Sequence, residues 1–143
     1  MPKPLSIDDD LAELLKAVLK LEKFFPKFGT RELLMLFPHS GLFRYAADEP
    51  VIKQGEASRD IYILKEGSVA ITRGGDNPKL LATLVPPEIF GEIALVREGV
   101  RVANAVALEQ SAIFRLSYPD IQALVVGNPP LAEHLENLAK ERS

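Results

Sequence analysis

Between Gly41 and Leu116 the chain alternates short apolar runs with turn residues, and this pattern restricts the fold more than any other feature. The runs are rich in Val, Ile, Leu and aromatic residues: PVIK, IYIL, VAIT, KLLATLV and, later, NAVALEQSAIFRL. Between them stand QGEASRD, KEGS, RGGDNP and PPE, and RGGDNP has the composition of an exposed hairpin tip. Short strands at regular spacing predict an antiparallel barrel, roll or sandwich. Only PEIFGEIALV lacks the alternation of a strand, and we expect one short helical turn there.

Helical patterns precede this β-block. Ser6 and the acidic run 8–10 can cap a helix whose apolar residues recur at helical spacing, and we expect this helix to end at Pro26. The segment TRELLMLF predicts a second, short helix that is capped by Thr30 and stops before Pro38.

Two further helices are expected after the β-block. Ser117 can cap SYPDIQALVV and Gly127 can end it, while Asn128 can cap NPPLAEHLENLAKERS, which has prolines in its first turn. The last helix has an apolar stripe that must cover either the β-block or a second chain. This stripe consists of Leu131, Leu135 and Leu138.

The chain has the size of one domain. Its 143 residues are enough to bury a proper core. We therefore expect a single domain over 1–143, made of an N-terminal helical segment (1–38), the β-block (41–116) and the two C-terminal helices (117–143).

Composition and charge argue against several classes of function. The net charge is −3 and the lysines and arginines are scattered, so we expect no basic face for nucleic acid. The absence of cysteine excludes disulfides and thiolate metal sites and fits a reducing compartment. The N-terminus is too acidic for a signal peptide and no apolar run approaches the length of a membrane span, so we expect a cytoplasmic protein.

The usual signatures of enzymes and metal sites are missing from the sequence. There is no nucleophile-base pair, Walker loop or dinucleotide fingerprint, so we expect a protein that is not an enzyme. His39 and His134 are far apart and lack cysteine neighbours, so we expect surface or cap residues and no zinc site. The acidic run 8–10 is interpreted as a helix cap and not as a calcium site. The carboxylates in the turns are interpreted as solvated: Glu49, Glu56 and Asp60.

The stretch FGEIALVREGVRVANAVA, residues 90–107, carries Glu92 and Arg101 among residues apolar enough to be buried. An unpaired charge that is removed from water is costly, so each of these groups needs a partner. Two arrangements satisfy this requirement. The charges pair with each other and hold the loop shut, or each binds a group that comes from outside.

The order of elements resembles that of the cyclic nucleotide-binding domain. FGEIAL (90–95) matches the complete F-G-E-[IL]-A-L core of the family's phosphate-binding cassette, and VRVANA (100–105) stands where the family has P-R-x-A-[TN]-[VI]. VIKQGEASRDIYILKEGSVAI resembles its paired-glycine signature, with Gly55 and Gly67 in turns where we expect positive φ. The chain looks like the cyclic-AMP receptor domains of bacterial catabolite activators and of cyclic-AMP-dependent kinase regulatory subunits. The resemblance covers roughly 41–126.

This resemblance implies a mainly β fold with flanking helices. The implied architecture is an antiparallel β-roll, also described as a jelly-roll barrel or double-stranded β-helix. It has N-terminal helices, a short phosphate-binding helix and two C-terminal helices that act as hinge and lid.

The resemblance also implies a site for a cyclic nucleotide. Arg101 would bind the cyclic phosphate together with main-chain N–H groups, and Gly91 would let the backbone approach the ligand. Glu92 would accept a hydrogen bond from the ribose 2′-hydroxyl, and the base would lie against apolar residues, with the last helix as a lid. The expected ligand-binding residues are Ile71, Phe90, Gly91, Glu92, Ile93, Ala94, Arg101, Val102 and Ala103. No metal or cofactor is implied.

Three residues of this stretch bear on the comparison with the family. Val100 replaces the proline before the arginine, and Asn104 stands where threonine is common but asparagine also occurs. Family members that select cyclic GMP tend to carry a threonine at the position of Val102, and valine has no hydroxyl to offer a guanine. We therefore expect cyclic AMP as the ligand, in preference to cyclic GMP.

Two hypotheses of different class remain. In the first, the chain is a stand-alone cyclic nucleotide sensor that signals through movement of its C-terminal helix. In the second, the same fold has no working ligand site and acts as a dimerisation or docking subunit. The leucine stripe of the last helix suggests this hypothesis, because an exposed stripe of that kind can bind a partner helix. Direct DNA regulation would need a helix-turn-helix, and we expect no DNA-binding element in the short segment 117–143.

Overall fold

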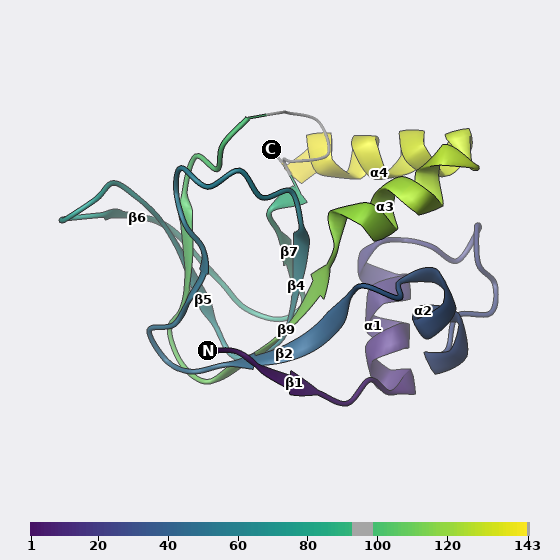
Figure 1. Cartoon of the computed structure of the whole chain (residues 1–143), viewed down its shortest axis with the longest axis horizontal. Coiled ribbons are helices and arrows are strands. Elements are labelled where there is room, and N and C mark those ends of the chain that lie inside the picture. The colour runs from purple at the N-terminus through teal and green to yellow at the C-terminus, as the bar shows by residue number, and fades with distance from the viewer. Residues whose placement is uncertain (93–98, 143) are drawn as a thin grey trace.

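The computed structural model describes residues 1–92 and 99–142 and consists of two antiparallel sheets and four helices (Figure 1). The strands are β1 (Lys3–Leu5), β2 (Gly41–Tyr45), β3 (Pro50–Ile52), β4 (Ile61–Glu66), β5 (Val69–Arg73), β6 (Lys79–Leu84), β7 (Glu88–Phe90), β8 (Asn104–Ala107) and β9 (Ser111–Leu116). The helices are α1 (Asp9–Val18), α2 (Thr30–Leu36), α3 (Tyr118–Val126) and α4 (Pro129–Arg142).

The two sheets have the orders β1-β2-β9-β4-β7 and β3-β8-β5-β6, and all their strand pairs are antiparallel. Side chains from both sheets meet in one buried cluster, which includes Ile52, Leu64, Val69, Phe90 and Ile113. The sheets therefore face each other as the two layers of a roll. The predicted β-roll with flanking helices is confirmed. The short phosphate-binding helix was expected within PEIFGEIALV (87–96), and residues 93–96 of that stretch lie outside the described residues.

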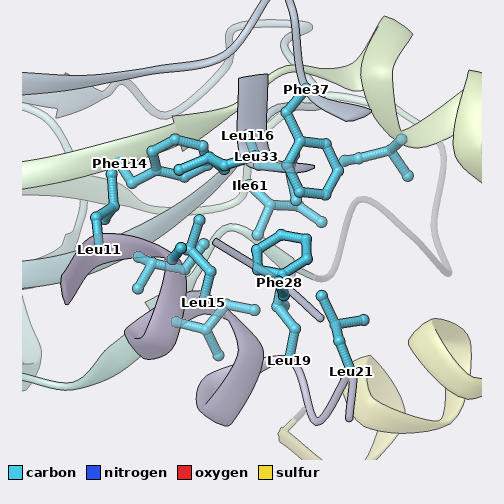
Figure 2. Close-up of a cluster of buried hydrophobic side chains, with 14 of the residues drawn as sticks. Leu11, Leu15, Leu19, Leu21, Phe28, Leu33, Phe37, Ile61, Phe114 and Leu116 are labelled. Atoms are coloured by element: carbon cyan, nitrogen blue, oxygen red, sulfur yellow. The ribbon is translucent and has the colours of Figure 1, made fainter. Parts of the chain in front are cut away.

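The four helices gather on one side of the molecule, against the outer face of the five-stranded sheet (Figure 1). Leu11 and Leu15 of α1 are fully buried there, and they face side chains of β9 such as Phe114 (Figure 2). Alternation along the strands makes this second cluster possible. In β9, Phe114 and Leu116 belong to the helix side, whereas Ile113 belongs to the interior of the roll.

Local signals at the hairpins and at the C-terminal helices are confirmed. The segment RGGDNP connects β5 to β6, and Gly55 and Gly67 have φ of +92° and +98°. At Gly67 a Cβ would lie 2.1 Å from the Ser111 hydroxyl oxygen, so only glycine fits this turn. The Ser117 side chain accepts from the Asp120 N–H at 3.4 Å, and the Asn128 side chain accepts from the Leu131 N–H at 3.2 Å.

The leucine stripe of α4 is buried within its own chain. Leu131, Leu135 and Leu138 are at most 7% exposed and belong to the cluster between the helices and the five-stranded sheet. His134, on the same helix, places Nε2 2.9 Å from the Leu19 carbonyl oxygen at the end of α1. Both contacts hold α4 on the body of the domain.

Three expectations about the helices were wrong in detail. α1 ends at Val18, well before Pro26, because Lys20 takes a left-handed conformation with φ of +52°. The cap of α2 is Gly29, and Thr30 is the first residue of the helix. The Thr30 N–H and hydroxyl instead donate to the Asp9 carboxylate of α1, at 2.9 and 2.7 Å. The start of PEIFGEIALV is strand β7, which pairs with β4.

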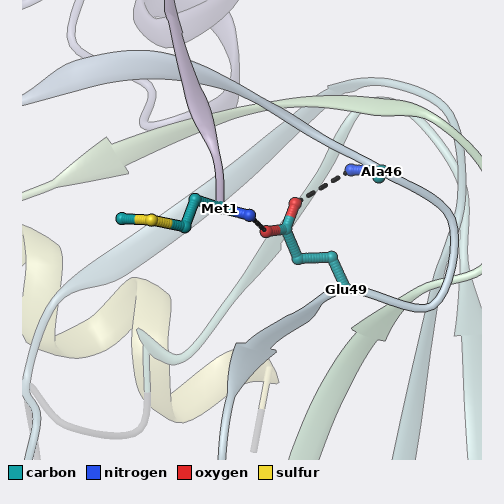
Figure 3. Close-up of polar contacts among 3 residues, drawn as sticks. All are labelled: Met1, Ala46 and Glu49. Atoms are coloured by element: carbon teal, nitrogen blue, oxygen red, sulfur yellow. Dashed lines mark hydrogen bonds and ion pairs between the residues drawn. The ribbon is translucent and has the colours of Figure 1, made fainter.

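Strand β1 is an element that the sequence pattern did not reveal. It is short and its register is set by β2, with Pro4 opposite Phe43. Beside it, the Glu49 carboxylate pairs with the Met1 ammonium at 2.5 Å and accepts from the Ala46 N–H at 3.0 Å (Figure 3). Glu49 therefore holds a turn and the first strand together, and only 14% of its side chain is exposed.

Candidate functional site

A pocket with about 390 Å³ of empty space, partly open to solvent, lies between strands of both sheets. Its walls come from β3, β5, β7 and β8 and from the segments that follow β7 and precede β8. The residues that line it are Ile52, Ile71, Phe90, Gly91, Arg101, Val102, Ala103, Asn104 and Ala105. A hydrophobic wall with one cationic side chain is the usual composition of a site for a small charged ligand.

Most of the residues expected at the site line this pocket. They are Ile71, Phe90, Gly91, Arg101, Val102 and Ala103. Glu92 follows Gly91 directly and is half-buried. Ile93 and Ala94 lie outside the described residues. Three further lining residues, Ile52, Asn104 and Ala105, were not expected, and of these Ile52 comes from a strand far from the motif in sequence.

Arg101 is buried, with 7% of its surface exposed, and its guanidinium donates to three oxygen atoms. Nε donates to the Ser58 hydroxyl at 3.1 Å, Nη1 to the Gly91 carbonyl at 3.0 Å, and Nη2 to the Asp60 carbonyl at 2.6 Å. These acceptors are all uncharged. The contacts orient the side chain, but they do not neutralise its positive charge.

The main chain of Arg101 is equally well held. Its N–H donates to the Glu56 carbonyl, and its own carbonyl accepts from the Gly55 N–H, both at 2.8 Å. These two bonds tie the segment before β8 to the loop between β3 and β4. The loop QGEASRD therefore supplies main-chain and side-chain partners to the same arginine.

Burial is the main reason why the pKa of the Arg101 guanidinium lies below its ordinary value. Four neighbouring groups raise the pKa of Arg101 again. From the largest effect to the smallest, they are Tyr62, Glu56, Asp60 and Glu92. Glu92 is the weakest of these influences. Within the described part of the chain, the guanidinium is fixed by its hydrogen bonds to Ser58, Gly91 and Asp60.

Gly91 is required by the packing around the guanidinium. Its φ is +79°, and a Cβ there would lie 3.1 Å from Arg101 Nη1 and 3.2 Å from the Asp60 carbonyl oxygen. Any side chain would both strain the backbone and crowd the arginine.

The apolar wall of the pocket rests on the core of the roll. Phe90 is buried and stacks on Tyr62, with the ring centroids 5.4 Å apart. Ile71 is only half-buried and faces the pocket from β5. Val102 is 52% exposed, so its side chain is accessible to a ligand.

Asn104 has a structural role at the rim of the pocket. Its side-chain oxygen accepts from the Gln54 N–H at 2.8 Å, and its side-chain nitrogen donates to the Thr72 hydroxyl at 3.3 Å. These bonds tie β8 to β5 and to the loop after β3. Asn104 therefore uses both polar atoms of its side chain to hold the rim of the pocket.

Asp60 was interpreted as solvated, and that interpretation was wrong. Its carboxylate accepts from the Tyr118 N–H at 2.9 Å, at the first residue of α3. Ser58 and Asp60 were missed as supports of Arg101 because they lie 43 and 41 residues away from it in sequence. The only local signal was the concentration of polar residues in QGEASRD.

The family model described as cyclic nucleotide-binding domain matches residues 42–128, which is more than half of the chain. The chain belongs to the cyclic nucleotide-binding domain family. The matched range includes all the residues that line the pocket and the loop between β3 and β4 that holds Arg101.

Relatives of this cyclic nucleotide-binding domain occur in bacteria and mammals. It is 35% identical over 100 residues to the cyclic AMP receptor protein of Thermus thermophilus, covering 68% of this chain and 46% of that protein. It is 40% identical over 68 residues to human cGMP-dependent protein kinase 2, covering 46% of this chain and 9% of the kinase. The chain thus spans less than half the length of these relatives, whose names include both cyclic AMP and cyclic GMP.

A solved structure supports the arrangement of the elements. The crystal structure of the sensor domain of the transcriptional regulator DNR from Pseudomonas aeruginosa matches with a TM-score of 0.76 at 26% identity. The match covers 93% of this chain and 88% of that one.

Two further properties concern residues 1–92 and 99–142. None of their helices combines the length and the apolar character needed to cross a membrane. None of their histidine, aspartate or glutamate side chains gather in groups of three or more that could hold a metal ion.

Proposed function

We propose that this domain is a sensor that binds a cyclic nucleotide, and that its ligand is cyclic AMP. The observation that carries the proposal is the state of Arg101: a buried guanidinium beside an open apolar pocket, held by uncharged oxygens. Such a charge is stabilised when a compact anion binds next to it. A cyclic phosphodiester carries one negative charge and matches this requirement.

Each part of the nucleotide has a proposed partner. The guanidinium has more N–H donors than its present contacts use, so Arg101 can bind the phosphate without leaving its place. Glu92, half-buried beside Gly91, would accept a hydrogen bond from the ribose 2′-hydroxyl. The base would lie against Ile71 and the exposed side chain of Val102. Ile93 and Ala94 would add main-chain N–H groups to the phosphate.

The preference for cyclic AMP rests on Val102. It lines the pocket and has no hydroxyl with which to bind the polar edge of a guanine. A guanine would therefore leave polar groups unsatisfied at this position, whereas the loss for an adenine is smaller.

Signalling would take place through the C-terminal helices. Ligand binding can move α3 and α4 only to the extent that the nucleotide binds one arrangement of them more tightly than another. We restrict the proposed function to binding and helix movement, without catalysis, because the sequence carries no nucleophile-base pair, Walker loop or dinucleotide fingerprint. We place this sensor in the cytoplasm, where a chain without cysteine meets a reducing environment.

Isothermal titration with cyclic AMP, with cyclic GMP in parallel and 5′-AMP as the non-cyclic control, tests this function. We expect saturable binding with cyclic AMP the tightest of the three. An absence of heat with both cyclic nucleotides up to high micromolar concentration would overturn the proposal.

The alternative is a domain without a working ligand site that serves as a docking or dimerisation subunit. One observation favours it: the Arg101 guanidinium already donates three hydrogen bonds to oxygen atoms of its own chain. The leucine stripe of α4 no longer supports it, because these side chains are buried in the domain's own core. A partner or a second copy would have to use another surface of the C-terminal helix. The same titration separates the two functions, since the alternative predicts no nucleotide binding.

A further inference from the structure

Asp60 makes contact with the candidate phosphate site and with α3 through two different groups. Its main-chain carbonyl accepts from Arg101 Nη2 at 2.6 Å. Its side-chain carboxylate accepts from the Tyr118 N–H at 2.9 Å. One residue, immediately before β4, thus joins the arginine of the pocket to the first N–H of a helix.

The preceding residue strengthens the link to the same tyrosine. The Arg59 guanidinium lies 4.2 Å from the centre of the Tyr118 ring and donates to its hydroxyl at 2.6 Å. Arg59 and Tyr118 also line a groove between α3 and α4, together with Leu135 and Glu136 of α4. A displacement at 59–60 therefore reaches both C-terminal helices.

The start of α3 has a second support that is independent of Arg101. The Ser117 hydroxyl accepts from the Asp120 N–H, and the Asp120 carboxylate accepts from the His39 N–H at 2.9 Å and the Ser40 hydroxyl at 2.6 Å. This support ties α3 to the loop before β2. The N-terminus of α3 is thus held by two sets of hydrogen bonds, one through Ser117 and Asp120 and the other through Asp60.

We infer that Asp60 is the positioning residue that transmits occupancy of the Arg101 site to α3 and α4. The inference rests on the proposed function. An anion that binds the remaining N–H groups of the guanidinium competes with the Asp60 carbonyl for the same positive charge, because both are acceptors and the anion is the stronger one. The weakened carbonyl contact shifts residue 60, and its carboxylate then releases the N–H of Tyr118. By linkage, the position of α3 in turn changes the affinity for the anion.

Amide hydrogen exchange of the first turn of α3 tests this coupling. We expect saturating cyclic AMP to accelerate exchange at the amides of Tyr118 and Ile121 by on the order of fivefold or more in the unmodified chain. In Asp60→Ala this acceleration disappears. In Asp60→Asn it is retained, because the amide oxygen can still accept from Tyr118.

Ser117→Ala is the matched control. It removes the other side-chain acceptor at the same helix end, so it loosens α3 in the free protein, yet it leaves the path from Arg101 through Asp60 intact. We expect it to keep the acceleration by cyclic AMP. Equal acceleration in Asp60→Ala and in the unmodified chain would overturn the inference. So would bound nucleotide with no change at α3 in the unmodified chain.

A measurement without nucleotide separates failure of the inference from failure of the proposed function. Arg101→Lys keeps the charge but loses the fork that reaches Asp60, so exchange at Tyr118 should become faster in the ligand-free chain. In the Asp60→Ala background the same change should have no further effect. Additive effects of the two substitutions would refute the coupling even if cyclic nucleotides bind, and non-additive effects would support it even if they do not.

Discussion

Arg101 Nη2 and the Asp60 carbonyl oxygen are 2.6 Å apart, which is the shortest of the three hydrogen bonds that hold the buried guanidinium. The bond joins the segment before β8 to the loop before β4. A site that belongs to one short motif in the sequence is thus built from two loops in the fold. The consequences for binding and stability are open to direct measurement.

Removing the Arg101 guanidinium should weaken cyclic nucleotide binding the most. A charge-assisted hydrogen bond contributes roughly 1.5–3 kcal/mol, so Arg101→Ala should lose roughly tenfold to hundredfold in affinity. Calorimetric titration measures the loss. Arg44→Ala, at an exposed arginine on β2 outside the pocket, is the control and should bind like the parent. Parental affinity in Arg101→Ala would mean that the phosphate is bound elsewhere.

A hydroxyl at position 102 should shift the choice of nucleotide. Val102→Thr adds a donor and acceptor to the wall of the pocket, so the affinity for cyclic GMP relative to cyclic AMP should rise by about twofold to tenfold, the value of one neutral hydrogen bond. Competition between the two nucleotides measures the ratio. Val100→Thr makes the same chemical change at an exposed residue outside the pocket and should leave the ratio unchanged. An unchanged ratio in Val102→Thr would remove the reason to prefer cyclic AMP.

A methyl group at Gly91 should damage both folding and binding. The positive φ alone costs about 1–3 kcal/mol for a non-glycine residue, and the new Cβ would press on Arg101 and the Asp60 carbonyl. Gly55→Ala separates these effects, because φ is +92° there and a Cβ would meet no atom within 4 Å. Chemical denaturation should show both variants destabilised, while titration should show the larger loss of affinity in Gly91→Ala. Equal affinities would contradict the crowding of the guanidinium.

Acid should weaken the contact between α1 and α2. The hydrogen bonds from the Thr30 hydroxyl and N–H hold the pKa of the Asp9 carboxyl below its ordinary value. Because the pKa is lower in the folded than in the unfolded chain, the contact stabilises the fold at neutral pH. That stabilisation is lost as the pH falls below about 4 and through the folded-state pKa.

Asp9→Asn tests this dependence. Its free energy of unfolding, measured between neutral and acidic pH, should fall less steeply with decreasing pH than that of the parent. Asp10→Asn, at the exposed neighbouring residue, is the control. A parental slope in Asp9→Asn would show that the Thr30 contact does not form in solution.

The sequence determined the features that depend on near neighbours along the chain. Strand alternation, the hairpin RGGDNP, the caps Ser117 and Asn128 and the turn glycines each involve residues a few positions apart, and all of them are present in the structure. Phe90, Gly91 and Arg101, which the motif singled out, line the pocket together because they fall within one short stretch of the chain.

The tertiary structure decided which residues, distant in sequence, form hydrogen bonds with each charged side chain. Ser58 and Asp60 support Arg101, Asp9 holds Thr30, and Glu88–Phe90 became a strand because β4 offers its edge. It also decided that the leucine stripe of α4 covers its own domain. These outcomes depend on the close approach of segments far apart in sequence. Such segments pack where they bury apolar area and, at the same time, give buried polar groups hydrogen-bond partners. The pattern of any one segment cannot contain that information.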